Sequence, residues 1–256
     1  MNTLDKAIYE YHNNLDKSVI QICEDYNLSP YDLYNGLDYK DPKRKGRKHK
    51  KYSWNKDSFI IDSPEKYYWL GFIAADGYVK NSGLRIDLKE IDISHLIKFK
   101  NFTEYNGEIK YHTNNLKCKA CYLDLNDVNL KNIFSEYNIV QNKSLSFVIP
   151  EEKIPQEFLI DFCRGLIDGD GCIRINNHQQ ISLSFCSGNK TCVEQINRIL
   201  GINNKVSFSN HCYGVQVTGN KKAKQILDYL YKNSTEKTRL DRKYLIYYNK
   251  FYKEEE

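Results

Sequence analysis

The sequence lacks the features that mark membrane and secreted proteins. Its 256 residues contain no run of about eighteen apolar residues, which a membrane-spanning helix requires. The first residues, Met1 to Asp5, do not have the basic and then apolar build of a secretory signal. We therefore expect an intracellular protein with no membrane partner, in the cytoplasm or nucleoid of a bacterium or phage-infected cell, or in a eukaryotic nucleus or organelle.

A disulfide framework and a complete zinc motif are also missing. Eight cysteines in a long chain without a secretory signal are typical of reduced thiols. Only Cys118 and Cys121 have the spacing of metal ligands, and no second pair or nearby histidine pair completes four ligands. We expect an ordinary strand there, with a zinc site as the alternative.

Acidic residues are scarce in residues 40–56, although the net charge of the whole chain is only +5. This stretch carries nine Lys or Arg against the single acid Asp41, a local charge of +8 that leaves −3 elsewhere. Clustered cations beside Tyr52 and Trp54 suit contact with the phosphates of a nucleic acid. A solvated linker over residues 40–57 is the alternative, and both can hold. The DNA contacts expected here are Lys43, Arg44, Lys45, Arg47 and Lys48.

Residues 1–39 are expected to form a small all-α, helix-turn-helix-like unit. Helices are predicted over residues 4–11, 18–26 and 29–37, with Ser29 as the cap of the third and Pro30 as its first residue. Short trihelical patterns also occur in proteins that do not bind DNA, so the pattern leaves the role of this unit open.

A ten-residue segment occurs twice, 94 residues apart. Residues 68–77 read YWLGFIAADG and residues 162–171 read FCRGLIDGDG. Each copy predicts a helix ending at Asp-Gly, followed by two strands, a helix, two strands and a helix. The expected fold class is therefore α+β, with two tandem αββαββα subdomains at 58–150 and 151–256. After the repeated helix, elements are expected at 78–80, 84–89, 94–103, 108–112, 120–125 and 128–137, and then at 172–175, 181–186, 190–200, 205–209, 213–218 and 221–231.

Strand periodicity gives each predicted sheet one apolar and one polar face. Leu84, Ile86 and Leu88 alternate with Arg85, Asp87 and Lys89, and the second half repeats the pattern. A polar outer face is ordinary for antiparallel sheets, so plain solvent exposure is the alternative to base or phosphate contact. The DNA-contacting candidates on these faces are Arg85, Asp87, Lys89, Lys110, His112, Arg174, Asn176, Ser182, Ser184, Gln216 and Thr218.

The repeated helices carry a small-residue stripe and a terminal acid. Gly71 with Ala75, and Gly165 with Gly169, lie four residues apart, so the two helices are expected to pack closely. Packing does not explain an acid at both helix ends, where the helix dipole disfavours a carboxylate. If the helices run side by side, Asp76 and Asp170 meet, and a hard cation such as Mg²⁺ would relieve their repulsion.

Such an acid pair indicates metal-assisted phosphodiester hydrolysis, because the cation activates water and offsets charge on the leaving oxygen. The expected cofactor is Mg²⁺, with Mn²⁺ as a substitute, and the expected partner is a nucleic acid rather than a small molecule. Gly77 and Gly171 are predicted to be left-handed residues that end the helices, with backbone metal contacts at most.

The two segments resemble the two motifs of the LAGLIDADG homing endonucleases, over residues 59–251. The resemblance implies two subdomains joined through the motif helices and saddled on the major groove of a long DNA site. It implies double-stranded DNA as the partner, double-strand breaks with 3′ overhangs, and Asp76 and Asp170 as catalytic acids. The first motif departs from the family pattern at Ala74, where the second keeps Asp168. We expect Asp168 to be a hydrogen-bond acceptor at the helix end.

The resemblance also implies a basic residue near each scissile phosphate. Lys143 and Lys237 each follow their aspartate by 67 residues, which favours equivalent positions in the two halves. Each lysine is a candidate to order water or stabilise the charged transition state. Chance coincidence is the alternative, because lysine is frequent in the chain.

Other functions on the same scaffold compete with cleavage. A DNA-binding regulator or an RNA-splicing maturase would share the fold, and fold alone does not separate them. Retention of both Asp76 and Asp170, together with the paired Lys143 and Lys237, favours the nuclease. A nuclease inside a protein-splicing element would need a nucleophile at the first residue and a His-Asn end, so we expect a monomeric enzyme that is free-standing or encoded by an intron, as part of a mobile genetic element.

Overall fold

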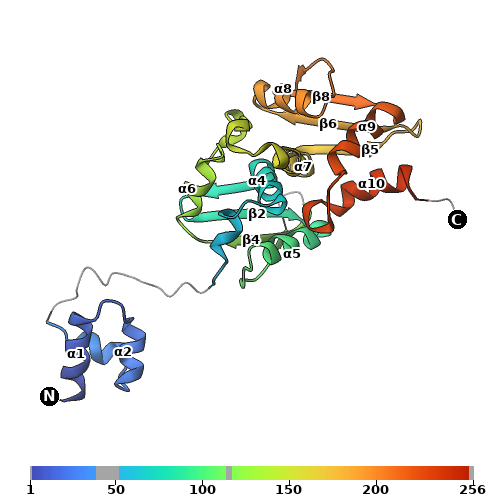
Figure 1. The fold of residues 1–256 in the computed structure, drawn as a ribbon. Helices are drawn as coiled ribbons and strands as arrows, with labels where there is room; N and C mark the ends of the chain where they lie inside the picture. Colours follow the sequence, from blue (N-terminus) through green and yellow to red (C-terminus); the bar gives the residue numbers. More distant parts are fainter. Residues whose placement is uncertain (1, 39–51, 114–116, 254–256) are drawn as a thin grey trace. The chain divides into compact units, whose positions relative to one another are not determined.

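The computed structural model describes residues 2–38, 52–113 and 117–253. The chain divides into two compact units, Met1–Lys51 and Tyr52–Glu256, which are described separately (Figure 1). In the described ranges, no helix is long and apolar enough to cross a membrane. All eight cysteines are free thiols.

The first unit consists of three short helices, α1 (Thr3–Asn13), α2 (Val19–Asp25) and α3 (Pro30–Asn35). Asn2, Ser18 and Ser29 cap them, each with a capping box that satisfies backbone N–H groups at the helix start. Their apolar sides meet in a core of Ala7, Tyr11, Ile22, Cys23 and Leu33. The predicted helices are present, but the third ends at Asn35 rather than at residue 37, because Gly36 follows.

The second unit contains the two repeats, and the predicted α+β fold is confirmed (Figure 1). The first repeat consists of α4 (Pro64–Asp76), β1 (Gly77–Lys80), β2 (Gly83–Lys89), α5 (Ile93–Phe102), β3 (Lys110–Thr113), β4 (Lys119–Leu125) and α6 (Leu130–Ser135). The second repeat consists of α7 (Leu159–Asp170), β5 (Gly171–Ile175), β6 (Ile181–Ser187), α8 (Lys190–Ile199), β7 (Ser207–Ser209), β8 (Cys212–Thr218) and α9 (Asn220–Tyr231), and α10 (Asp241–Phe251) follows. The antiparallel sheets have the equivalent orders β1-β2-β4-β3 and β5-β6-β8-β7.

Short 3-10 turns connect several of these elements. They are η2 (Lys56–Phe59), η3 (Glu90–Asp92), η4 (Lys143–Leu145), η5 (Glu151–Lys153), η6 (Gln156–Phe158) and η7 (Glu236–Thr238). A single apolar core runs through both repeats, from Phe59 to Tyr247.

The helices α4 and α7 pack side by side at the centre of the second unit (Figure 1). A Cβ atom added to Gly71 would lie 2.0 Å from the carbonyl oxygen of Phe162, and one added to Gly165 would lie 2.0 Å from that of Tyr68. These two contacts are related by the 94-residue offset of the repeat, as pseudo-twofold symmetry requires. A Cβ atom added to Gly169 would lie 2.3 Å from the Cβ atom of Ala75, so the C-terminal ends of the two helices meet and the helices run parallel. The predicted close packing is therefore confirmed.

The expected linker over residues 40–57 is too long at its C-terminal end. The Asn55 amide donates to the carbonyl of Thr103 at 2.8 Å, and the Asn106 amide donates to that of Ser53 at 3.2 Å. The Trp54 indole donates to Asp127 at 3.1 Å. Residues 53–55 thus belong to the first repeat, because their backbone and aromatic groups are satisfied by it.

Candidate active site

Asp76 and Asp170 are the last residues of α4 and α7, and they come together because the two helices are parallel. A Cβ atom at Gly169 would lie 3.5 Å from the Asp76 amide nitrogen, which shows how closely the two helix ends meet. Burial, and next the Asp170 carboxylate, raise the pKa of Asp76 to about 6. Burial also raises the pKa of Asp170. Both side chains are still open to solvent on one side, so an external ligand can reach them.

Gly77 and Gly171 end the helices, but the prediction of left-handed backbone is wrong. Both have φ of −80°. A Cβ atom at Gly77 would lie 2.6 Å from the Ile73 carbonyl oxygen, and one at Gly171 would lie 2.5 Å from that of Ile167. Glycine is therefore required because the chain folds back closely over the last helical turn, and not because φ is positive.

Two buried lysines hold these glycines in equivalent ways. Lys143 donates from Nζ to the Gly77 carbonyl at 2.5 Å, and Lys243 donates to the Gly171 carbonyl at 2.5 Å. Burial lowers the pKa of each ammonium group. The nearby acids act in the opposite direction, Asp170 and Asp76 on Lys143, and Asp168 and Asp76 on Lys243. Two acids and two lysines thus form one electrostatic cluster.

The prediction that Lys237 is the counterpart of Lys143 is wrong. Lys237 is 66% exposed and pairs with Glu65 at 3.3 Å, at the opposite end of α4 from Asp76. The equal offset of 67 residues assumed repeats of equal length. However, α9 has 12 residues and α6 has six, so the matching contact falls later in the chain, at Lys243. The sequence signal for Lys243 was its place in the segment Leu240-Asp241-Arg242-Lys243, which lies inside the span 59–251 that resembles the family.

Asp168 is a buried hydrogen-bond acceptor, as expected. Its carboxylate accepts from the Tyr68 hydroxyl at 2.9 Å, the Tyr231 hydroxyl at 3.3 Å and the Leu240 amide at 2.7 Å. Burial raises its pKa, and Lys243 and these hydrogen bonds act in the opposite direction. With 1% of its surface exposed, Asp168 is shielded from an external metal ion.

The segment that follows each repeat forms charged pairs with the other repeat. Arg242 donates to both oxygens of Asp92, at 2.9 Å to 3.3 Å, and Lys98 pairs with Asp241 at 2.7 Å. On the other side, Glu151 accepts from Arg198. The two repeats are therefore joined by charged pairs as well as by α4 and α7.

The outer face of the first sheet presents most of its predicted contact residues, but several already have partners. Arg85 forms a two-pronged pair with Asp124 at 2.7 Å and 3.0 Å and stacks over the Tyr122 ring at 4.3 Å. His112 contacts Asp87 at 2.9 Å. The side chains of Lys89 and Lys110 are exposed. Lys80, which contacts Asp124, was not predicted from the sequence. Strand alternation could have identified it, because Lys80 lies two residues after Tyr78 and therefore on the same face of β1.

On the second sheet, only some of the residues predicted from strand alternation to lie on the outer face are exposed. Arg174, Gln216 and Thr218 are exposed, and Ser184 is half-buried. Ser182 is 3% exposed and its hydroxyl donates to the Arg174 carbonyl, so it does not present a free contact group. Asn176 accepts from the amides of His178 and Gln180 and shapes the turn after β5.

The N-terminal unit has the wrong charge for a phosphate-binding surface. Residues 2–38 contain seven acids and two lysines, a net charge of −5. Lys17 pairs with Glu10 and Asp25. A role in DNA contact by α3 is not supported by these charges, since Asp32 and two exposed tyrosines occupy that helix. The predicted contacts Lys43, Arg44, Lys45, Arg47 and Lys48 lie outside the described residues.

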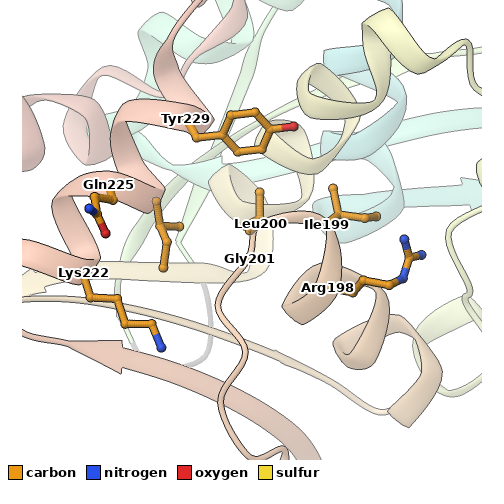
Figure 2. A pocket seen from close by; sticks show the side chains of 8 residues that line it. Arg198, Ile199, Leu200, Gly201, Lys222, Gln225 and Tyr229 are labelled. Atoms are coloured by element: carbon orange, nitrogen blue, oxygen red, sulfur yellow. The ribbon is translucent and has the colours of Figure 1, made fainter.

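Two surface hollows lie away from the acid pair. A hollow of about 310 Å³ lies between the end of α8 and α9, where Arg198, Lys222 and Tyr229 line it (Figure 2). A second, of about 440 Å³, lies where α4 begins and includes Glu65, Lys237 and Arg239. Neither contains Asp76 or Asp170, so neither belongs to the candidate active site.

The carboxylates of Asp76 and Asp170 suit a hard cation that also binds substrate. In the part of the chain that the structure describes, there is no group of three or more His, Cys, Asp or Glu side chains arranged to hold a metal ion. This also applies to Cys118 and Cys121, of which Cys121 is a buried residue of β4. Mg²⁺ commonly takes only one or two carboxylates, with water and substrate phosphates as further ligands. The repelling pair Asp76 and Asp170 fits that requirement.

Comparison with known proteins found neither a matching family model nor a matching curated protein. Among solved structures, the chain is similar to the LAGLIDADG meganuclease I-AabMI bound to uncleaved DNA, with 14% identity over 67% of this chain and 84% of that one, and a TM-score of 0.44. It is also similar to the N-terminal LAGLIDADG domain of DUF199/WhiA, with 16% identity over 71% and 90%, and a TM-score of 0.43. Full-length DUF199/WhiA from Thermatoga maritima matches with 12% identity over 77% and 66%, and a TM-score of 0.45. At such identities, the likeness concerns the fold alone.

Proposed function

We propose that the chain is a site-specific endonuclease of double-stranded DNA that works with Mg²⁺. The observation that carries this proposal is the meeting of Asp76 and Asp170 at one end of two parallel helices, where burial and the Asp170 carboxylate raise the pKa of Asp76 and both side chains remain reachable from solvent. Two neighbouring carboxylates repel each other when both are ionised, and a phosphate-bound cation would offset that repulsion.

The acids and the lysines have different roles in this proposal. Asp76 and Asp170 would hold Mg²⁺, which supplies an activated water and offsets charge on the leaving oxygen. Lys143 and Lys243 fix the two glycine turns that carry the acids and place positive charge beside the reacting phosphates. Because these lysines are buried, their charge is screened less by water than that of a surface lysine.

Recognition of DNA is assigned to the outer faces of the two sheets. Lys89, Lys110 and Arg174 are exposed cations on these faces, and Gln216 is an exposed amide that suits adenine. The basic stretch around Lys43 to Lys48 would add phosphate contacts that carry no sequence information. The resemblance to the homing endonucleases further implies a long, nearly non-palindromic site and breaks with 3′ overhangs.

A two-step selection tests the proposal. The protein first selects duplexes from a randomised library without a divalent cation, Mg²⁺ is then added, and the product ends are sequenced. Staggered breaks with 3′ overhangs at one site would support the endonuclease. A defined site that is bound but stays intact would replace it with a non-cleaving DNA-binding protein, and failure to select any duplex would contradict a DNA partner.

A further inference from the structure

Asp168 connects three elements that meet behind the second half of the site. Its buried carboxylate accepts from Tyr68 on α4, from Tyr231 on α9 and from the backbone of Leu240. Residue 74, which holds the equivalent position in the first repeat, is alanine and has no such group. The two halves of the site are therefore built differently.

The bond to Leu240 lies close to Lys243. Leu240 is the residue that precedes α10, and its carbonyl accepts from the Lys243 amide at 3.0 Å. From there the Lys243 side chain returns to the end of α7, where Nζ donates to the carbonyls of Ile167, Asp168 and Gly169 at 2.9 Å, 2.6 Å and 3.1 Å, besides that of Gly171. Asp168 thus holds the backbone that carries Lys243, and Lys243 holds the backbone of Asp168.

Lys143 is held by different means. It belongs to η4, and its ammonium donates to the Gly77 carbonyl, with no carboxylate at residue 74 to hold its backbone. Leu145, on the same turn, packs against the second repeat near Gly188. A change at Asp168 should therefore reach Lys243 and leave Lys143 in place.

We propose that Asp168 is a positioning residue, which keeps Lys243 beside Asp170 through the Leu240 backbone and serves only the half of the site that contains Lys243. Its catalytic meaning rests on the proposed endonuclease function. In that setting each lysine serves one of the two strands, so loss of Asp168 slows the cutting of one strand and leaves a nicked duplex.

Amine labelling of the full-length protein, without DNA or metal, tests the positioning directly. A pulse of acetic anhydride followed by mass spectrometry measures the labelling rate of each lysine. Lys143 and Lys243 are 7% and 5% exposed and should label slowly, whereas the exposed Lys237 is the fast reference. In Asp168→Ala we expect Lys243 to label on the order of 10-fold faster while Lys143 is unchanged, because a local restraint has been lost.

Two further variants separate the hydrogen bond from general damage. Asp168→Asn keeps an oxygen for the Leu240 amide and should label as the wild type does. Leu240→Pro removes the same bond from the donor side at a φ of −82°, which proline adopts, and should expose Lys243 even if Asp168→Ala does not fold. Unchanged labelling of Lys243 in the folded variants, or an equal rise at Lys143, would overturn the proposal.

Strand-resolved cleavage of a selected duplex tests the consequence. Asp168→Ala should slow one strand by roughly 10- to 100-fold, as the loss of supporting groups around a catalytic centre commonly does, and leave the other within about twofold. Equal slowing of both strands would overturn the assignment to one half. If the wild-type protein cuts neither strand, the endonuclease proposal fails, while the labelling result still decides whether Asp168 positions Lys243.

Discussion

Replacing Asp76 with asparagine should stabilise the protein in the absence of divalent cations. The folded state raises the pKa of this carboxyl from 3.8 to about 6, by burial and by the Asp170 carboxylate. The folded state thus binds this proton more tightly than the unfolded state, and the ionised group destabilises the fold at neutral pH. Asparagine has nearly the same shape and removes the charge.

The size of the effect follows from the pKa. A rise from 3.8 to about 6 corresponds to about 3 kcal/mol for a group shielded from water. Asp76 is open to solvent, so screening reduces the expected gain to on the order of 1 kcal/mol. For a unit of this size, that gain corresponds to a rise in Tm of about 2 to 4 °C.

Thermal unfolding with chelator present measures this gain, with Asp57→Asn, an exposed acid on η2, as the control. The stabilisation should be full at pH 7.5, decrease as pH falls through about 6, and vanish only below about pH 3, where Asp76 is protonated in both states because the pH is then below its ordinary pKa of 3.8. Mg²⁺ should stabilise the wild type and not Asp76→Asn. A variant that is less stable than the wild type at pH 7.5, or a gain that is undiminished at about pH 3, would refute the electrostatic reasoning.

Three other outcomes can be measured. In a gel assay on the selected duplex, Lys143→Met and Lys243→Met should each reduce DNA cleavage by at least about 10-fold, while Lys237→Met cleaves as the wild type does. Loss of activity in Lys237→Met would contradict the assignment of Lys243. Changing Lys43, Arg44, Lys45, Arg47 and Lys48 to Gln should reduce the slope of log binding constant against log salt concentration by up to about 4. Deleting residues 2–38, which carry a charge of −5, should not weaken DNA binding. Fluorescence anisotropy titrations at several salt concentrations measure both effects. Gly71→Ala should lower the free energy of unfolding by more than about 4 kcal/mol in chemical denaturation, because its Cβ would lie 2.0 Å from the Phe162 carbonyl oxygen. Gly201→Ala is the control and should cost far less despite its φ of +64°, because nothing lies within 4 Å of the added Cβ.

The repeated segment made the centre of the molecule predictable from sequence. Two copies of the same helix, each with small residues four apart and an acid at the end, can bury their stripes against each other in only a few ways. The parallel packing of α4 and α7 followed, and with it the meeting of Asp76 and Asp170. The identity of Asp168 as an acceptor also followed, since a carboxylate at a helix end needs donors.

Other parts of the site depended on contacts that spacing does not encode. Lys243 was missed because helix α9 is longer than α6, which shifts the contact with the glycine turn along the chain. Gly77 and Gly171 proved to be required by close approach of the chain to its own helix, which a sequence cannot distinguish from a left-handed turn. Ser182 has the right strand phase, but its short side chain is covered by its neighbours.

The most direct test of the account is cleavage of the selected duplex with Mg²⁺ by the wild type, Asp76→Asn, Asp170→Asn and the control Asp57→Asn. We predict that both active-site variants bind the duplex with wild-type affinity in chelator but lose cleavage by several orders of magnitude, while the control cuts normally. Cleavage that persists in either active-site variant would contradict a shared centre built from the two helix ends.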